Sequence, residues 1–244
     1  MRLLVHGMQS GGATAFAQVL AQRPGCVALV DIPNNFAAPR VTTGVDFVAK
    51  AVVTTAYPLA VHVERFRPDK VVLLLRDPRD NYESLRTKPY RNFSGLIDEK
   101  FQVLEQLYAQ SHRFDAVLHY EDLVARDPVL LETMARLGWP IGPDYFHFRR
   151  SYDELLGSLW AAEPGLQQQM DVVFGNARGK ELSDSHRDKG WTREIEEKVA
   201  TLCPQLLAHY QARAPSRQPV DMPAGGEWWS GTQYSQANGV QDDR

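Results

Sequence analysis

Short apolar runs alternate with longer amphipathic stretches through most of the chain. The runs are rich in leucine and valine, and they cover residues 3–6, 27–30, 71–75 and 116–119. They lack the alternating polar positions of a strand with one exposed face. Continuous apolar runs of this length are typical of strands buried on both faces. Such strands belong in a parallel sheet, which the pattern therefore predicts.

Helical periodicity fills much of the chain between and after these runs. It covers residues 13–22, 79–86, 96–113, 128–137 and 192–212. The fourth of these segments begins at Pro128 and is preceded by Asp127, and an Asp-Pro pair is a typical helix start. Helices that connect parallel strands cross over the sheet and cover its faces. We therefore expect an α/β fold with a central parallel β-sheet flanked by helices on both faces.

The length and the composition favour one domain followed by a tail. A chain of 244 residues can fill a single α/β domain. From about residue 214 the sequence becomes rich in proline and glycine and offers little apolar surface for burial. We expect a domain over residues 1–213 and a disordered tail over residues 214–244.

Charge, cysteine content and hydrophobicity argue against several kinds of partner and site. The 27 lysines and arginines nearly balance the 30 aspartates and glutamates, and neither half is strongly basic. This argues against a nucleic-acid partner. Cys26 and Cys203 are far apart, so neither a disulfide framework nor a cysteine zinc site is expected. No stretch approaches the roughly 18 apolar residues of a membrane span. We expect a cytoplasmic protein without a membrane partner.

A glycine-rich turn connects the first apolar run to the first helix. Glycines at 7, 11 and 12 permit unusual backbone angles, and Ser10 and Thr14 supply hydroxyl groups. A turn between a strand and a helix presents backbone N–H groups to an anion, so it suits a phosphate. The alternative is a tight turn without a ligand. A Walker loop would need lysine where Ala13 stands, and the spacing does not fit G-x-G-x-x-G, so neither ATP with Mg²⁺ nor a dinucleotide is favoured.

A second motif follows the apolar run at residues 71–75. The run ends in Arg76, and a turn then leads into a helix that carries Ser84. Ligands of α/β sheets gather beyond the carboxyl ends of the strands, so Arg76 and the glycine turn are expected to face one pocket. Arginine offers phosphate a planar fork of donors. The alternative for Arg76 is a salt bridge with Asp77 or Asp80.

These segments together resemble the sulfotransferases that use 3′-phosphoadenosine 5′-phosphosulfate (PAPS). In that family a strand is followed by R-D/N-P-R-D, with a serine eight residues after the first arginine, and Arg76 and Ser84 match this spacing. Residues 119–128, H-Y-E-D-L-V-A-R-D-P, are similar to a later family segment, R-Y-E-D-L-x-x-D-P. The segments occur in family order over residues 3–137. Residues 187–191 are more weakly similar to the basic C-terminal loop that closes over the nucleotide.

The resemblance implies a P-loop-like nucleotide-binding architecture and an enzyme that transfers a sulfuryl group to a hydroxyl of a small-molecule acceptor, for example a secondary metabolite. PAPS would be the donor and adenosine 3′,5′-bisphosphate (PAP) the product, with no metal. Arg76 and Ser84 would hold the 3′-phosphate, and Arg187 and Lys189 would close the site. The 5′-phosphosulfate would lie on the loop formed by Gln9, Ser10, Gly11, Gly12, Ala13 and Thr14.

The chain departs from the family pattern at the catalytic positions. The family loop usually reads K/R-S-G-T-T, whereas Gln9 stands at the position of the cation. Lys50 is a candidate to replace that charge, although a solvated lysine is the alternative. Asp31 follows the second apolar run and is a candidate general base, although a turn-forming aspartate is the alternative. His62 lies within an expected helix over residues 59–66, and we expect it to be structural.

Two other classes of function remain open from the sequence. A small nucleotide kinase would share the strand, loop and helix, but should have a lysine at the Ala13 position. A non-catalytic nucleotide-binding module would fit the absence of the usual loop cation and of a histidine base.

Overall fold

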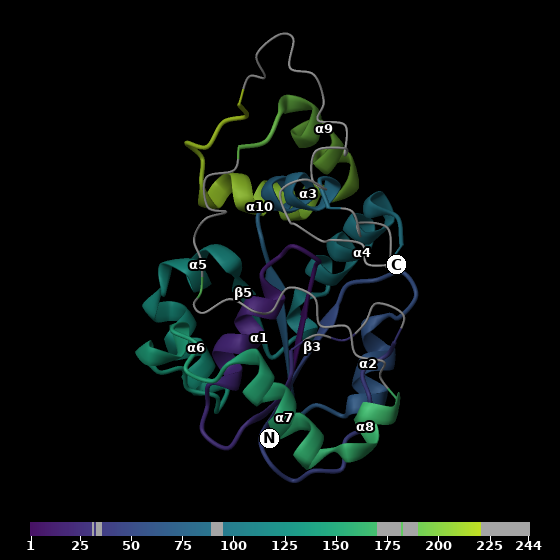
Figure 1. Cartoon of the computed structure of the whole chain (residues 1–244). Coiled ribbons are helices and arrows are strands. Elements are labelled where there is room, and N and C mark those ends of the chain that lie inside the picture. Colours follow the sequence, from purple (N-terminus) through teal and green to yellow (C-terminus); the bar gives the residue numbers. More distant parts are fainter. Residues whose placement is uncertain (31, 33–35, 89–94, 170–181, 183–189, 221–244) are drawn as a thin grey trace, which may run out of the picture.

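The computed structural model of the 244-residue chain describes all residues except 31, 33–35, 89–94, 170–181, 183–189 and 221–244 (Figure 1). The described residues fold around a sheet of five parallel strands in the order β2-β3-β1-β4-β5. The strands are β1 (Arg2–Gly7), β2 (Val27–Leu29), β3 (Phe47–Val52), β4 (Lys70–Leu75) and β5 (Ala116–His119).

The predicted parallel sheet is confirmed, with one strand more than the sequence pattern indicated. β3 lies between β2 and β1, and its sequence F-V-A-K-A-V is fully buried. Lys50 interrupts the apolar run of this strand, so the sequence pattern did not predict it. β1 occupies the centre of the sheet, and Gly7 at its end is in register with Val52 of β3 and Leu74 of β4.

Helices cover both faces of the sheet, as predicted. Alternate residues of a strand point to opposite faces, and along β4 they belong to two different apolar clusters. Val72 and Leu74 pack in the first cluster with Phe16, whereas Leu73 and Leu75 pack in the second. The helices are α1 (Ala13–Ala21), α2 (Leu59–Phe66), α3 (Pro78–Arg86), α4 (Ile97–Ala109), α5 (Tyr120–Ala125), α6 (Pro128–Arg136), α7 (Tyr152–Ala162), α8 (Pro164–Gln169), α9 (Arg193–Leu202) and α10 (Pro204–Arg213).

Several helix boundaries differ from the sequence prediction for identifiable reasons. The helix expected over residues 192–212 is two helices, because Pro204 cannot continue the hydrogen-bonded ladder of α9 and instead begins α10. α4 ends at Ala109 and is followed by a short 3-10 turn over Ser111–Arg113. α7 and α8 fall in a stretch without a clean period. Among the described helices, none combines the length and apolar character needed to cross a bilayer.

α3, α9 and α10 group beyond the carboxyl ends of the strands (Figure 1), and residues 214–220 lie against this group. Arg217 makes two hydrogen bonds to the Asp80 carboxylate, at 2.7 and 3.0 Å. The guanidinium of Arg217 also lies over the Trp191 ring, as does that of Arg79. The Val220 N–H donates to the Trp191 carbonyl at 2.8 Å. These contacts attach residues 214–220, the start of the expected tail, to the domain; residues 221–244 lie outside the described part.

Removing the Arg217 guanidinium should destabilise the protein more at pH 7 than at pH 4. Burial raises the pKa of Asp80, and Arg217 opposes that rise. In Arg217→Ala the pKa of Asp80 in the folded protein would rise further above its value in the unfolded chain. The variant therefore loses stability as the pH increases above the pKa of the unfolded carboxyl group. We expect a loss of about 1–3 kcal/mol at neutral pH, because solvent partly screens Arg217, and a smaller loss at pH 4, both measured by urea denaturation.

Arg213→Ala is the matched control, since Arg213 pairs with Asp122 at the surface. A surface ion pair contributes about 0–1 kcal/mol. A loss in Arg217→Ala that is equal at both pH values would contradict the assignment.

Candidate functional site

The turn after β1 adopts a conformation that requires glycine. Ser10 and Gly12 both have left-handed backbone angles, with φ of 58° and 87°. A Cβ atom at Gly12 would lie 2.2 Å from the Tyr120 ring, and one at Gly11 would lie 2.9 Å from the Met8 carbonyl oxygen. The Gly11 N–H closes the turn by donating to that carbonyl at 3.0 Å. The backbone therefore approaches its neighbours too closely for any side chain at Gly12.

The turn leads directly into the N-terminus of α1. The first-turn N–H groups of a helix have no acceptor within the helix. Gly12, at the N-cap position, has no side chain that could cap them, and no acidic residue occupies the first turn. The helix dipole adds partial positive charge at the same place. This end of α1 can therefore receive an anion through backbone donors.

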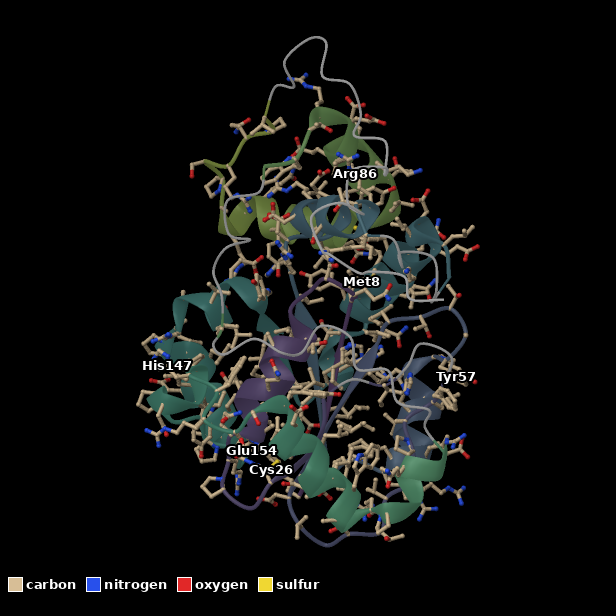
Figure 2. All side chains as sticks on the ribbon, in the orientation of Figure 1. Met8, Cys26, Tyr57, Arg86, His147 and Glu154 are labelled. Atoms are coloured by element: carbon tan, nitrogen blue, oxygen red, sulfur yellow. The ribbon has the colours of Figure 1, made fainter. Side chains whose placement is uncertain are left out.

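Side chains from three other elements donate to the acceptors of the turn. Arg76, immediately after β4, donates from Nη1 to the Ser10 carbonyl at 2.7 Å. Asn81 of α3 donates from Nδ2 to the Gln9 carbonyl at 2.7 Å. Lys100 of α4 donates from Nζ to Gln9 Oε1 at 2.8 Å. The turn begins at Met8, which is labelled in Figure 2. The hydrogen bonds from these three side chains fix its shape.

Arg76 lies at the centre of these contacts. It is 4% exposed, and its guanidinium lies 4.9 Å from the centre of the Tyr120 ring, at the end of β5. The same ring packs against Gly12. Arg76 thus meets the glycine turn at the carboxyl edge of the sheet, where its position after β4 predicted it. Ser84 follows Asn81 by three residues on α3, so the two are neighbours on the helix surface, and it is 6% exposed.

A buried acidic network supports the backbone next to Arg76. Glu121 Oε1 accepts from the Asp77 N–H at 2.9 Å, and Glu121 Oε2 accepts from the Tyr210 hydroxyl at 3.3 Å. Burial raises the pKa of Glu121, and the Asp77 N–H opposes this. The Tyr210 oxygen is also 2.8 Å from His119 Nδ1. These bonds join the end of β5 to the turn after β4. In the part of the chain that the structure describes, no three histidine, cysteine or carboxylate side chains are grouped as a metal site.

The fold is similar to known structures, although the sequence matches no known family model. No family model and no curated protein matches the sequence. Among solved structures, the sulfotransferase domain of the olefin synthase from Synechococcus PCC 7002 superposes with a TM-score of 0.50 at 13% identity, over 91% of this chain and 95% of that one. The chain has a sulfotransferase-like fold.

Weaker likenesses were found to two further structures. Mouse sulfotransferase SULT7A1 complexed with PAP gives a TM-score of 0.41 at 10% identity, over 88% of this chain and 85% of that one. Retinol dehydratase in complex with androsterone and PAP gives 0.39 at 14% identity, over 91% and 82%.

Within the sulfotransferase-like fold, the residues proposed as catalytic are placed only in part. Lys50 lies in β3 opposite Val5, two residues before the end of the strand, and is 4% exposed. Asp31 lies outside the described residues, and so do Arg187 and Lys189, which were expected to bind the nucleotide.

His62 lies in α2, as the sequence predicted, and is 2% exposed. Its Nδ1 accepts from the Ala38 N–H at 3.0 Å, and burial lowers the pKa of His62 to about 4. This contact gives the neutral ring a structural use, because it holds the segment that leads into β3.

Two donors to the turn, Asn81 and Lys100, were not predicted from the sequence. Lys100 stands in a charged stretch, Asp98-Glu99-Lys100, which resembles a solvated helix face. However, Lys100 follows Ile97 by three residues and precedes Leu104 by four, so it occupies the apolar stripe of α4. The side chain is 0% exposed, and burial lowers the pKa of Lys100 to about 8. A lysine in an apolar stripe was the signal available in the sequence.

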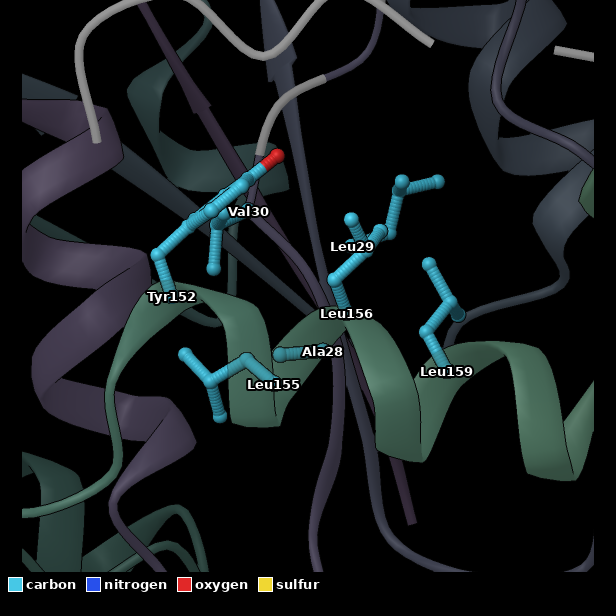
Figure 3. Close-up of a pocket in the computed structure, with 7 residues that line it drawn as sticks. All are labelled: Ala28, Leu29, Val30, Tyr152, Leu155, Leu156 and Leu159. Atoms are coloured by element: carbon cyan, nitrogen blue, oxygen red, sulfur yellow. The ribbon is translucent and has the colours of Figure 1, made fainter. Parts of the chain in front are cut away.

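A small apolar pocket lies between β2 and α7 (Figure 3). It has room for about one water molecule and is lined by Ala28, Leu29, Val30, Tyr152, Leu155, Leu156 and Leu159. Val30 directly precedes Asp31 in the chain. The pocket is separate from the glycine turn, which leaves the sheet from β1.

Gly12→Ala should destabilise the protein more than Gly25→Ala. Both glycines have positive φ, of 87° and 72°, but a Cβ at Gly25 would meet nothing within 4 Å. The control therefore carries only the backbone strain, about 1–2 kcal/mol. Overlap with the Tyr120 ring should add about 1–3 kcal/mol in Gly12→Ala. Urea denaturation measures the free energy of unfolding of each variant. Equal decreases in the two variants would contradict the expectation, because they would show that the Tyr120 ring moves aside without an energetic cost.

Proposed function

We propose that the chain is a sulfotransferase that moves a sulfuryl group from PAPS to a hydroxyl of a small-molecule acceptor. The observation that carries the proposal is the contact of Arg76 with the Ser10 carbonyl at 2.7 Å. It puts a guanidinium beside a helix N-terminus that is suited to an anion. Two adjacent anion sites suit a nucleotide with phosphate groups on both sides of its ribose. The sulfotransferase-like fold supports the same assignment.

In this proposal the two anion sites take different ends of the donor. The backbone N–H groups of residues 9–14 hold the 5′-phosphosulfate, which the close-packed glycines allow to approach the backbone. Arg76 and Ser84 hold the 3′-phosphate, for which the guanidinium supplies charge-assisted hydrogen bonds. Arg187 and Lys189 close over the nucleotide, an assignment that comes from the sequence resemblance.

The transfer moves one group and one proton. The acceptor oxygen forms a bond to sulfur while the bond from sulfur to the 5′-phosphate oxygen breaks, which leaves a sulfate ester and PAP. Asp31 takes the hydroxyl proton. Negative charge grows on the departing phosphate oxygen, and the N–H groups at the start of α1 are placed to stabilise it. In the sequence hypothesis Lys50 adds a positive charge to this stabilisation. No metal takes part in this scheme.

A transfer assay with labelled PAPS across a panel of alcohols and phenols tests the activity. Binding of PAP with no transfer to any acceptor would favour a non-catalytic nucleotide-binding module.

PAP should bind without Mg²⁺ and more tightly than adenosine 5′-monophosphate, because only PAP has a 3′-phosphate. Arg76→Ala should remove this preference. Charge-assisted contacts contribute roughly 1.5–3 kcal/mol, which is about ten- to a hundredfold in affinity. Arg76 also holds the Ser10 carbonyl, so both nucleotides should bind more weakly to the variant. The ratio of the two affinities, measured by calorimetry, is therefore the informative quantity.

Arg149→Ala serves as the control for this measurement, since Arg149 is exposed and pairs with Asp144. It should leave the preference intact. Equal affinities of the unmodified protein for the two nucleotides would disprove the 3′-phosphate assignment.

Asp31→Asn should slow transfer to an alkyl alcohol by about 10²–10⁴-fold while it leaves PAP affinity nearly unchanged, because it removes only the proton acceptor. His62→Gln should have a much smaller effect. A phenol acceptor, which needs less help from a base, should respond less to Asp31→Asn. Single-turnover rates test both variants, and an active Asp31→Asn beside an inactive His62→Gln would reverse the assignment.

A further inference from the structure

A buried cation stands behind the glycine turn. Lys100 reaches Gln9 from α4, with Nζ 2.8 Å from Oε1, and its side chain is 0% exposed. Its helix neighbours Phe101 and Leu104 belong to the apolar core. Burial of an ammonium group is costly, and an apolar residue of similar volume would fill such a position at less cost. Packing alone therefore does not explain a lysine here.

The contact also determines how Gln9 can act. Lys100 occupies the side-chain oxygen of Gln9, while Asn81 holds the Gln9 carbonyl at 2.7 Å. The amide nitrogen of Gln9 is consequently the donor end of the side chain. A cation bonded to the amide oxygen polarises the amide and strengthens its N–H groups as donors. The hydrogen bond from Lys100 thus gives the amide N–H groups of Gln9 more positive partial charge than those of a glutamine without a cationic partner.

We propose that Lys100 is a positioning residue that, through Gln9, supplies the 5′-phosphosulfate end of the site with the positive charge missing from the turn. The inference rests on the proposed function. It assigns to a helix far along the chain a charge that the sequence hypothesis gave to Lys50. The reason for preferring Lys100 is its direct hydrogen bond to a side chain of the turn.

The test separates the two ends of the nucleotide. Lys100→Gln keeps a hydrogen-bonding group opposite Gln9 but removes the charge, and Lys100→Met removes both. Each should weaken PAP binding about tenfold or more and leave adenosine 3′-monophosphate, which lacks the 5′-phosphate, unaffected. Gln9→Lys combined with Lys100→Gln returns the charge to the turn and should restore PAP affinity and the transfer rate. Lys70→Met, at an exposed lysine that pairs with Asp115, is the control and should change nothing.

The outcomes distinguish this inference from the proposed function. Unchanged PAP affinity in both Lys100 variants, or an equal loss for the two nucleotides, would overturn the inference and leave the function standing. Loss of PAP affinity in Lys50→Met but in neither Lys100 variant would assign the charge to Lys50 and overturn the inference. If the unmodified protein bound no PAP, the proposed function would fail. Binding of inorganic pyrophosphate would then test whether Lys100 supports an anion site at the turn. Thermal stabilisation by pyrophosphate that Lys100→Gln abolishes would support the inference, and no stabilisation of either protein would overturn it.

Discussion

The site depends on one buried arginine that joins the ends of three neighbouring strands. Arg76 extends β4, donates to the turn that follows β1, and stacks on Tyr120 at the end of β5. Tyr120 in turn packs against Gly12, where it leaves no room for a side chain. The direction of the α1 N-terminus is therefore set by contacts between elements that are far apart in the sequence. Loss of any one of them would disturb the others.

Burial of so many charges around this arginine needs compensation. Asp77 accepts from Arg79, and Asp80 from Arg217, while Glu121 accepts from a backbone N–H and a tyrosine hydroxyl. A buried carboxylate without such partners would cost several kcal/mol. The pairing also explains why residues 214–220 lie on the domain despite their prolines, because Arg217 contributes a charge that the acidic turn requires. The network links the turn after β4 to the end of β5, to α9 and to Arg217.

Much of the fold followed from local patterns, and the failures have physical causes. Continuous apolar runs identified four strands, and β3 was missed because Lys50 breaks its run. Helix periodicity could not separate α9 from α10, although Pro204 marked the boundary. Within the site, the turn and Arg76 were predicted from their places at strand ends. Lys100 was overlooked because a single lysine in a charged stretch is usually solvated, and only packing shows that it is buried.

The sequence by itself determined four of the five strands, the glycine turn and Arg76 as a donor beside it, because apolar periodicity and glycine at sterically demanding positions act locally. Only the tertiary structure decided which donors meet. Strand order places the ends of β1, β4 and β5 side by side, and the packing of α3 and α4 brings Asn81 and Lys100 to Gln9. Such contacts join residues up to 91 positions apart. Hydrogen bonds of this kind depend on distances in space, which no spacing along the chain specifies.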